Sequence, residues 1–190
     1  ALQAFSRLTA PEIEASLRLR AKLNKGEVLY YLKRHKEAAA TLQPLTAANI
    51  VPEIRARALY YAAKSLADGG KSEEAVKTFQ VLVTDLPDTQ LGVYGRYQLA
   101  FVYLNRIQLE EAALEFSEVA AAKTEDAIRM ESRYRAAEIY DKLGWFTAAV
   151  KAYEELQKAF PGSEYARRAD YGYAWALYHA GRYPEASAAA

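Results

Sequence analysis

Few side chains of this 190-residue chain combine in a way that could catalyse a reaction. The chain has two histidines, His35 and His179, and no cysteine, which excludes disulfides, thiolate nucleophiles and cysteine-based metal sites. The acidic pairs Glu73-Glu74 and Glu110-Glu111 suit the first turn of a helix, where the helix dipole favours negative charge. No phosphate-binding loop, metal-ligand cluster or Ser–His–Asp order occurs. We therefore predict a protein that is not an enzyme and needs no cofactor or metal.

Aromatic side chains at a fixed spacing carry the stronger chemical signal. Tyr60, Tyr97, Tyr134 and Tyr171 follow one another every 37 residues, and Leu23 occupies the preceding position. Tyrosine combines a rigid apolar ring with a polar hydroxyl, and together with Trp and Arg it is typical of binding hot spots. A recurrence at a period of 20 to 50 residues indicates a repeated structural unit that positions these rings.

Other columns repeat with the same period. One column is always alanine. The column four residues later is large and apolar, and the column twelve residues before the alanine is small. These columns are Ala38, Ala75, Ala112, Ala149 and Ala186; Leu42, Phe79, Phe116 and Tyr153; and Gly26, Ala63, Ala100, Ala137 and Ala174. Large residues at helical spacings predict two amphipathic helices per unit, and small residues indicate where helix backbones approach closely.

Residues that end or begin helices recur at the same register. Gly70, Gly144 and Gly181 fit a left-handed helix stop, although Lys33 and Ile107 stand at that position in two units. Pro87 and Pro161 close two of the second helices, and Ser72 and Thr147 suit their N-caps. Because one helix pair cannot bury its own apolar face, the pairs must stack. The fold class predicted is all-α, an α-solenoid of antiparallel helix pairs.

The stretch Tyr171-Gly172-Tyr173-Ala174, followed by Leu177, Gly181 and Ala186, resembles the tetratricopeptide repeat. The resemblance covers the chain and implies a right-handed superhelix. We expect residues 1–190 to form a single array cut from a longer one. Its parts are 1–10 as the second helix of a truncated repeat, four repeats at 16–48, 53–85, 90–122 and 127–159, and a truncated fifth at 164–190.

The resemblance implies that first helices line a concave groove that binds a partner. The predicted partner-binding residues are Arg57, Tyr60, Lys64, Tyr94, Tyr97, Phe101, Tyr134, Glu138, Arg168, Tyr171, Trp175 and Tyr178. The first predicted hot spot is Phe101 with Tyr94 and Tyr97, and the second is Trp175 with Tyr171 and Tyr178. Alternatively, the tyrosine column packs against the neighbouring repeat, fills the seam with its rings and leaves its hydroxyls at the rim.

The period of 37 and the link Phe160-Pro161-Gly162-Ser163-Glu164-Tyr165-Ala166 resemble one subgroup, bacterial envelope proteins of the Tol–Pal coordinator and β-barrel assembly lipoprotein types. This implies a periplasmic or outer-membrane-associated scaffold for a protein or peptide segment, with a cytoplasmic location as the alternative. Guidance of a polysaccharide, and a structural spacer that self-associates through apolar ends, remain alternatives. RNA binding fits the net charge of +1 poorly. No apolar run approaches the ~20 residues of a membrane span.

Overall fold

The computed structural model describes residues 10–190, and the predicted truncated helix at 1–10 lies almost wholly outside them. The described residues form ten α-helices and one 3-10 turn and contain no strand. The chain consists of two compact units, Ala1–Gly92 and Val93–Ala190, and each is described by itself. An all-helical fold is therefore confirmed.

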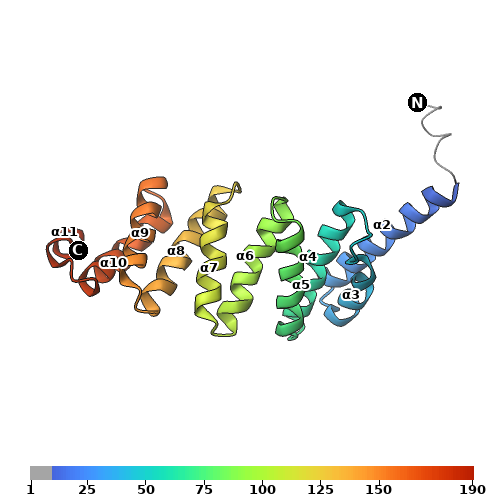
Figure 1. Ribbon diagram of the computed structural model, residues 1–190, viewed down its shortest axis with the longest axis horizontal. Helices are drawn as coiled ribbons and strands as arrows, with labels where there is room; N and C mark the ends of the chain where they lie inside the picture. The colour runs from blue at the N-terminus through green and yellow to red at the C-terminus, as the bar shows by residue number, and fades with distance from the viewer. Residues whose placement is uncertain (1–9) are drawn as a thin grey trace, which may run out of the picture. The chain divides into compact units, whose positions relative to one another are not determined.

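In the first unit, α2 (Ala10–Tyr31) pairs with α3 (His35–Leu42), which continues into the 3-10 turn η1 (Gln43–Leu45). The next pair is α4 (Pro52–Asp68) and α5 (Ser72–Asp85). The helices of each pair run antiparallel (Figure 1). Leu23, Leu42, Leu45, Ile54, Ala58 and Ala62 are buried together and join the two pairs.

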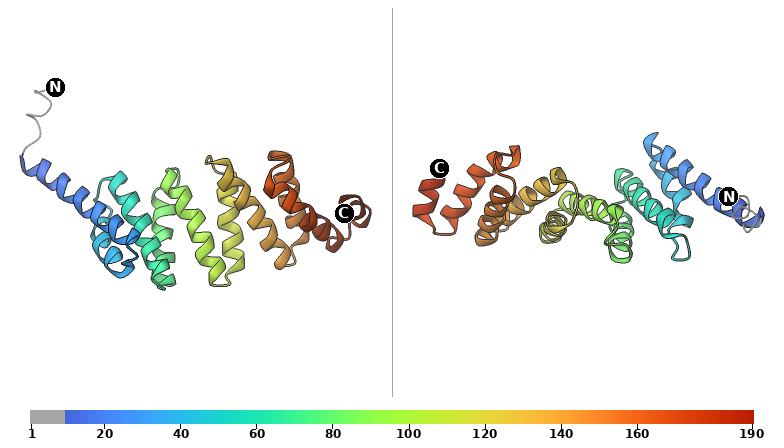
Figure 2. Two further views of the ribbon diagram at one scale, coloured as in Figure 1. Left: turned by 180° about the vertical axis from the view of Figure 1, so that it is seen from behind. Right: turned by 90° about the horizontal axis from the view of Figure 1, so that it is seen from above.

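The second unit begins inside α6 (Gln90–Asn105) and continues through α7 (Leu109–Ala121), α8 (Asp126–Lys142), α9 (Phe146–Ala159), α10 (Glu164–His179) and α11 (Tyr183–Ala189). Figure 2 shows each successive helix of this unit folding back beside the one before it. A core of alanines with Val150, Tyr153, Leu156 and Leu177 fills the space between α8, α9, α10 and α11. The paired helices give both units the architecture expected of a stacked repeat.

The second helices begin at a constant spacing of 37 residues. Their first residues are His35, Ser72, Leu109, Phe146 and Tyr183. The residue two positions before each start has a positive φ. These angles are 59° at Lys33, 79° at Gly70, 59° at Ile107, 74° at Gly144 and 77° at Gly181. The predicted left-handed stop is thus present after the first helix of all five helix pairs described, including the two pairs that lack glycine there.

Backbone hydrogen bonds define this stop as a Schellman turn. The Gln108 amide donates to the Tyr103 carbonyl at 3.0 Å, and the Ile107 amide donates to the Leu104 carbonyl at 3.0 Å. The other four turns repeat both bonds. The predicted N-caps Ser72 and Thr147 are wrong, because the turn makes the residue directly after the left-handed position the N-cap, which is Lys71 in α5 and Trp145 in α9.

The small column marks close helix contacts, as predicted. A Cβ on Gly26 would lie 2.4 Å from Leu42 Cγ, so only glycine fits beside that leucine in its present position. Ala63 and Ala137 at the same register are fully buried, as are Leu42 and Phe79 in the large column. This packing holds in place the first helices, which carry the predicted partner-binding residues.

Candidate binding surface

Three of the four tyrosines in the predicted ladder pack against the second helix of their own pair. Ring centroids are 6.4 Å apart for Tyr60 and Phe79, 6.2 Å for Tyr97 and Phe116, and 6.3 Å for Tyr134 and Tyr153. Tyr171 is the exception, because Ala190 stands at the register of those partner rings. Its side chain is 78% exposed. These three ring contacts lie within one helix pair, whereas the packing alternative places the rings against the neighbouring repeat.

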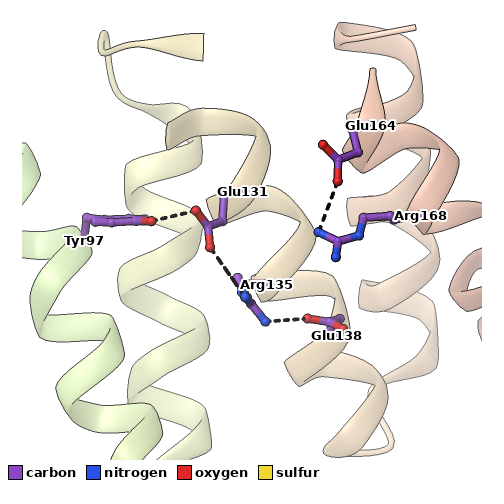
Figure 3. A network of polar contacts seen from close by, with 6 residues as sticks. All are labelled: Tyr97, Glu131, Arg135, Glu138, Glu164 and Arg168. Atoms are coloured by element: carbon purple, nitrogen blue, oxygen red, sulfur yellow. Dashed lines mark hydrogen bonds and ion pairs between the residues drawn. The ribbon is translucent and has the colours of Figure 1, made fainter. Parts of the chain in front are cut away.

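The Tyr97 hydroxyl lies in a polar network that joins α6 to α8 (Figure 3). It donates to Glu131 Oε2 at 2.7 Å, and Arg135 bridges Glu131 at 3.5 Å and Glu138 at 3.3 Å. Burial and the bond to the Glu131 carboxylate raise the pKa of Tyr97 well above its ordinary value. The hydroxyl stays protonated at neutral pH and holds the carboxylate in place.

The network continues toward α10 through aromatic and charged contacts. Tyr134 and Tyr165 pack at a centroid distance of 5.6 Å, and the Arg168 guanidinium lies 5.8 Å from the Tyr165 ring. Arg168 also pairs with Glu164 at 3.7 Å (Figure 3). Burial raises the pKa of Tyr165, and the nearby Glu131 carboxylate adds to the shift. The predicted site residues Tyr97, Tyr134, Glu138 and Arg168 thus share one continuous surface.

The first predicted hot spot is largely engaged in this packing. The Phe101 ring lies 5.0 Å from Tyr97 and 5.1 Å from the buried Phe116, measured between centroids. Tyr94 donates its hydroxyl to Glu125 Oε1 at 2.7 Å. Half-buried rings with bonded hydroxyls leave limited free area for a partner at this end of the surface.

The second predicted hot spot is open. Tyr171, Trp175 and Tyr178 lie along one face of α10 with exposed fractions of 78%, 47% and 54%. Neighbouring rings in this row are close to parallel, with interplanar angles of 12° and 24° and centroid distances of 6.4 Å and 6.1 Å. Tyr183 of α11 stands across from them, 5.3 Å from Tyr178 between centroids.

These four rings line a cavity of about 590 Å³ between α10 and α11, here called the α10–α11 cavity. Its remaining lining residues are Asp170, Ala174, Ala186, Ser187, Ala189 and Ala190. Asp170 and Tyr183 were not among the predicted site residues. Their part in the surface depends on how α10 and α11 come together.

Arg57, Tyr60 and Lys64 belong to the first unit. Arg57 makes two hydrogen bonds to the Glu27 carboxylate, at 2.9 and 2.7 Å. The Lys64 ammonium lies 5.8 Å from the centroid of the Tyr60 ring and 5.6 Å from that of Tyr30. The three predicted residues lie on α4, where Arg57 and Lys64 have partners on α2 and Tyr60 packs on α5.

The part of the chain that the structure describes contains no group of three or more His, Asp or Glu side chains placed to hold a metal ion. None of the helices described is both long enough and apolar enough to cross a membrane.

Comparison with known proteins agrees with the repeat architecture. MamA from AMB-1 superposes with a TM-score of 0.69 at 18% identity, covering 92% of this chain and 88% of that one. The nearly identical TPR-like repeats of a Podosopora anserina putative kinesin light chain give a TM-score of 0.63 at 19% identity, with coverages of 90% and 91%. At these identities the likeness establishes the fold. No curated protein sequence matches.

The sequence profile described as "Tetratricopeptide repeat" matches residues 23–88 and 134–190. The matched segments span most of both units and include the Schellman turns at Lys33, Gly70, Gly144 and Gly181. On this match and the helix-pair architecture, the chain belongs to the tetratricopeptide repeat family.

Proposed function

We propose that this protein is a non-enzymatic scaffold that binds a protein segment on the surface formed by α6, α8 and α10 of the second unit. Stacked helical repeats commonly offer an extended binding surface of this kind. The observation that carries the proposal is the exposed row of Tyr171, Trp175 and Tyr178 beside the α10–α11 cavity.

The row differs from the rest of the tyrosine column in having ring area left to bury. Fully covering one large apolar side chain contributes about 1.5–3 kcal/mol, so three partly exposed rings supply several kcal/mol to an interface. Trp and Tyr are also enriched among the few residues that dominate binding energies. A partner segment that covers this row would gain most of its affinity here.

The polar network beside the row sets the orientation of the bound segment. Glu131, Arg135 and Glu138 hold one another in place, so their remaining hydrogen-bonding capacity is fixed in space before a partner arrives. Tyr97 anchors the network to α6. In this proposal the network orients the segment, and the exposed aromatic row holds it.

A displayed library of random peptides selected on the purified protein tests the proposal. Peptides recovered on the wild type should lose about tenfold or more of their affinity for Trp175→Ala, the loss typical of a hot spot. Trp145→Ala is the matched control, since Trp145 is also exposed, at 44%, but packs on Tyr140 and does not line the α10–α11 cavity.

Circular dichroism of both variants verifies that they remain folded. Equal affinity of the selected peptides for wild type and Trp175→Ala would remove the row from the binding site. A scaffold should yield peptides that bind saturably and compete with one another for one site. If the selection yields no such peptides, the scaffold proposal as a whole is wrong.

We further propose a bacterial cell-envelope setting, periplasmic or associated with the outer membrane. The support is the 37-residue period and the link from Phe160 to Ala166, which comprises the turn after α9 and the first residues of α10. Fractionation of the source cells with an antibody against this chain tests it, and recovery with cytoplasmic markers alone would exclude it.

A polysaccharide partner is the second candidate, because nearly parallel exposed rings such as Tyr171 and Trp175 resemble a platform for sugar rings. Retardation on glycan affinity gels that Trp175→Ala abolishes would favour it over a protein segment. Migration unchanged by several polymers would leave the protein segment as the better candidate.

A further inference from the structure

We infer that a groove on the first unit is a binding site for a tyrosine side chain of a protein partner. The groove lies between the second helices α3 and α5, with the C-terminal end of α4 as its third wall, and is here called the α3–α5 groove. Its cavity measures about 540 Å³. This site lies beyond the proposed function, whose surface belongs to the second unit.

The α4 wall of the groove carries smaller side chains than the same registers two periods later in the sequence. The corresponding residues, in order, are Ser65 and Ile139, Leu66 and Tyr140, and Gly69 and Leu143. Because less volume projects from this wall, about 540 Å³ remain open in the first unit, compared with about 320 Å³ beside Tyr140. Ala39 in the α3 wall is accordingly half-buried, whereas its counterpart Ala113 is only 1% exposed.

The second unit shows which group suits this space. The Tyr140 ring lies against the Trp145 ring, with 6.0 Å between centroids and an interplanar angle of 27°. The Tyr140 hydroxyl shares a hydrogen bond of 2.8 Å with the Ser117 hydroxyl of α7. A phenol ring thus reaches from α8 to the second helix of the preceding pair. In the α3–α5 groove Leu66 is too short to do the same, so a tyrosine from a partner can take this position.

The groove offers a counterpart for each contact of Tyr140. Lys71 stands at the register of Trp145, and Gln43 stands at the register of Ser117. Both residues line the groove. An ammonium group attracts the face of an aromatic ring, and a glutamine amide can exchange a hydrogen bond with a phenolic hydroxyl. A tyrosine held in the groove would therefore meet Lys71 at its face and Gln43 at its hydroxyl.

The charges of the lining favour a ring over a basic side chain. Lys36 and Lys71 outnumber Glu74 among the charged residues that line the groove. The Glu74 carboxylate is already neutralised, because Lys71 Nζ lies 2.7 Å from its Oε1 atom. A lysine or arginine of a partner would meet the remaining positive charge and be repelled. The negative face of a neutral ring is attracted instead.

Three blocked amino acids serve as probes of the groove. They are N-acetyl-tyrosine amide, the phenylalanine analogue without the hydroxyl, and the cyclohexylalanine analogue without the aromatic face. The backbone amide signals of Ala39, Ala40 and Gly69 in proton–nitrogen correlation spectra of the whole chain report binding. The tyrosine probe should saturate these shifts with a dissociation constant at least about twofold lower than the phenylalanine probe, the effect of one hydrogen bond.

Two substitutions separate the contacts of the ring. Lys71→Gln should weaken both aromatic probes about two- to fivefold and leave the cyclohexylalanine probe unchanged. Lys77→Gln is the matched control, because Lys77 is an exposed lysine of the same helix that does not line the groove. It should change none of the three titrations. Gln43→Ala should give the tyrosine and phenylalanine probes equal affinity.

A third substitution fills the groove from within. Leu66→Tyr places the chain's own phenol ring where Tyr140 lies in the second unit, and it should abolish binding of all three probes. Tyr103 and Tyr140 stand at the same register, so the repeat accepts a tyrosine there. Circular dichroism verifies that the variant is folded.

Equal affinity of the aromatic probes for wild type and Lys71→Gln would overturn the inference. Full binding to folded Leu66→Tyr, or titrations that never saturate, would overturn it as well. Tighter binding of free tyrosine than of its blocked amide would identify a small molecule as the ligand and exclude the protein partner. None of these results bears on the peptides selected with Trp175→Ala, which test the proposed function alone.

Discussion

Replacing Ile107 by glycine should stabilise the protein. Ile107 has a φ of 59° and is 82% exposed, so it occupies the left-handed region with a β-branched side chain that buries almost nothing. Glycine adopts this conformation without steric cost. The Schellman bonds from residues 107 and 108 involve only backbone atoms and would remain after the change.

The expected gain follows from two opposing contributions. An L-residue in the left-handed region costs roughly 1–2 kcal/mol, and branching at Cβ places isoleucine toward the upper end. Glycine loses roughly 0.5–1 kcal/mol more conformational entropy than other residues on folding. The net increase in the free energy of unfolding is about 1 kcal/mol, which corresponds to about 2–4 °C in Tm for a chain of this length.

Urea and thermal unfolding followed by circular dichroism measure the change. Ile107→Ala is the matched control, because alanine keeps the left-handed cost and should gain much less than glycine. Gly144→Ala is the reverse experiment. The new Cβ would meet nothing within 4 Å, so the expected loss of about 1 kcal/mol is purely conformational.

An equal gain from Ile107→Ala and Ile107→Gly would refute the reasoning, because it would attribute the effect to removing an exposed apolar side chain. A neutral Gly144→Ala would refute it independently, because the same turn would then tolerate an L-residue without cost.

Three further changes test the packing and the polar network. Tyr97→Phe should lower the free energy of unfolding by about 1 kcal/mol at pH 7. Because the folded-state pKa of Tyr97 is raised, this contribution is complete below about pH 10 and is lost as pH rises further, so the two proteins should converge in alkaline urea titrations. Ser132→Ala should raise stability by about 1 kcal/mol, since the Ser132 hydroxyl is fully buried without a hydrogen bond. Ser65→Ala is its control, with a hydroxyl that bonds the backbone, and a gain there would contradict this explanation. Gly26→Ala should lower the free energy of unfolding by about 1–2 kcal/mol, because its Cβ would displace the buried Leu42, and an unchanged free energy would show that this leucine moves freely.

The helix pairs and their spacing were predictable because each repeat states the same pattern again. Ala38 and its successors mark one buried position of the second helix, and the turn position follows from Gly70, Gly144 and Gly181. The N-caps were mispredicted because side-chain type was read alone. Ser72 is a favourable cap residue, yet the backbone turn places Lys71 at the cap.

The candidate surface could be predicted from the sequence only in part. Column spacing gathers Tyr60, Tyr97 and Tyr134 on one register, but whether a ring is covered depends on the residue that the second helix places opposite it. Ala190 in that position leaves Tyr171 open. Asp170 joins the surface through the meeting of two helices, and no spacing along one helix reports that contact.

The left-handed turn has a consequence for how such a sequence can drift. Five positions hold one backbone geometry with three different residue types, namely glycine, lysine and isoleucine. Loss of glycine there leaves the turn in place and lowers stability by an amount that other substitutions can offset. Such a position can exchange residues back and forth over generations without changing the spacing of the helices. Glycine at this position is then the residue of lowest conformational cost, while the geometry of the turn is what selection on the fold preserves.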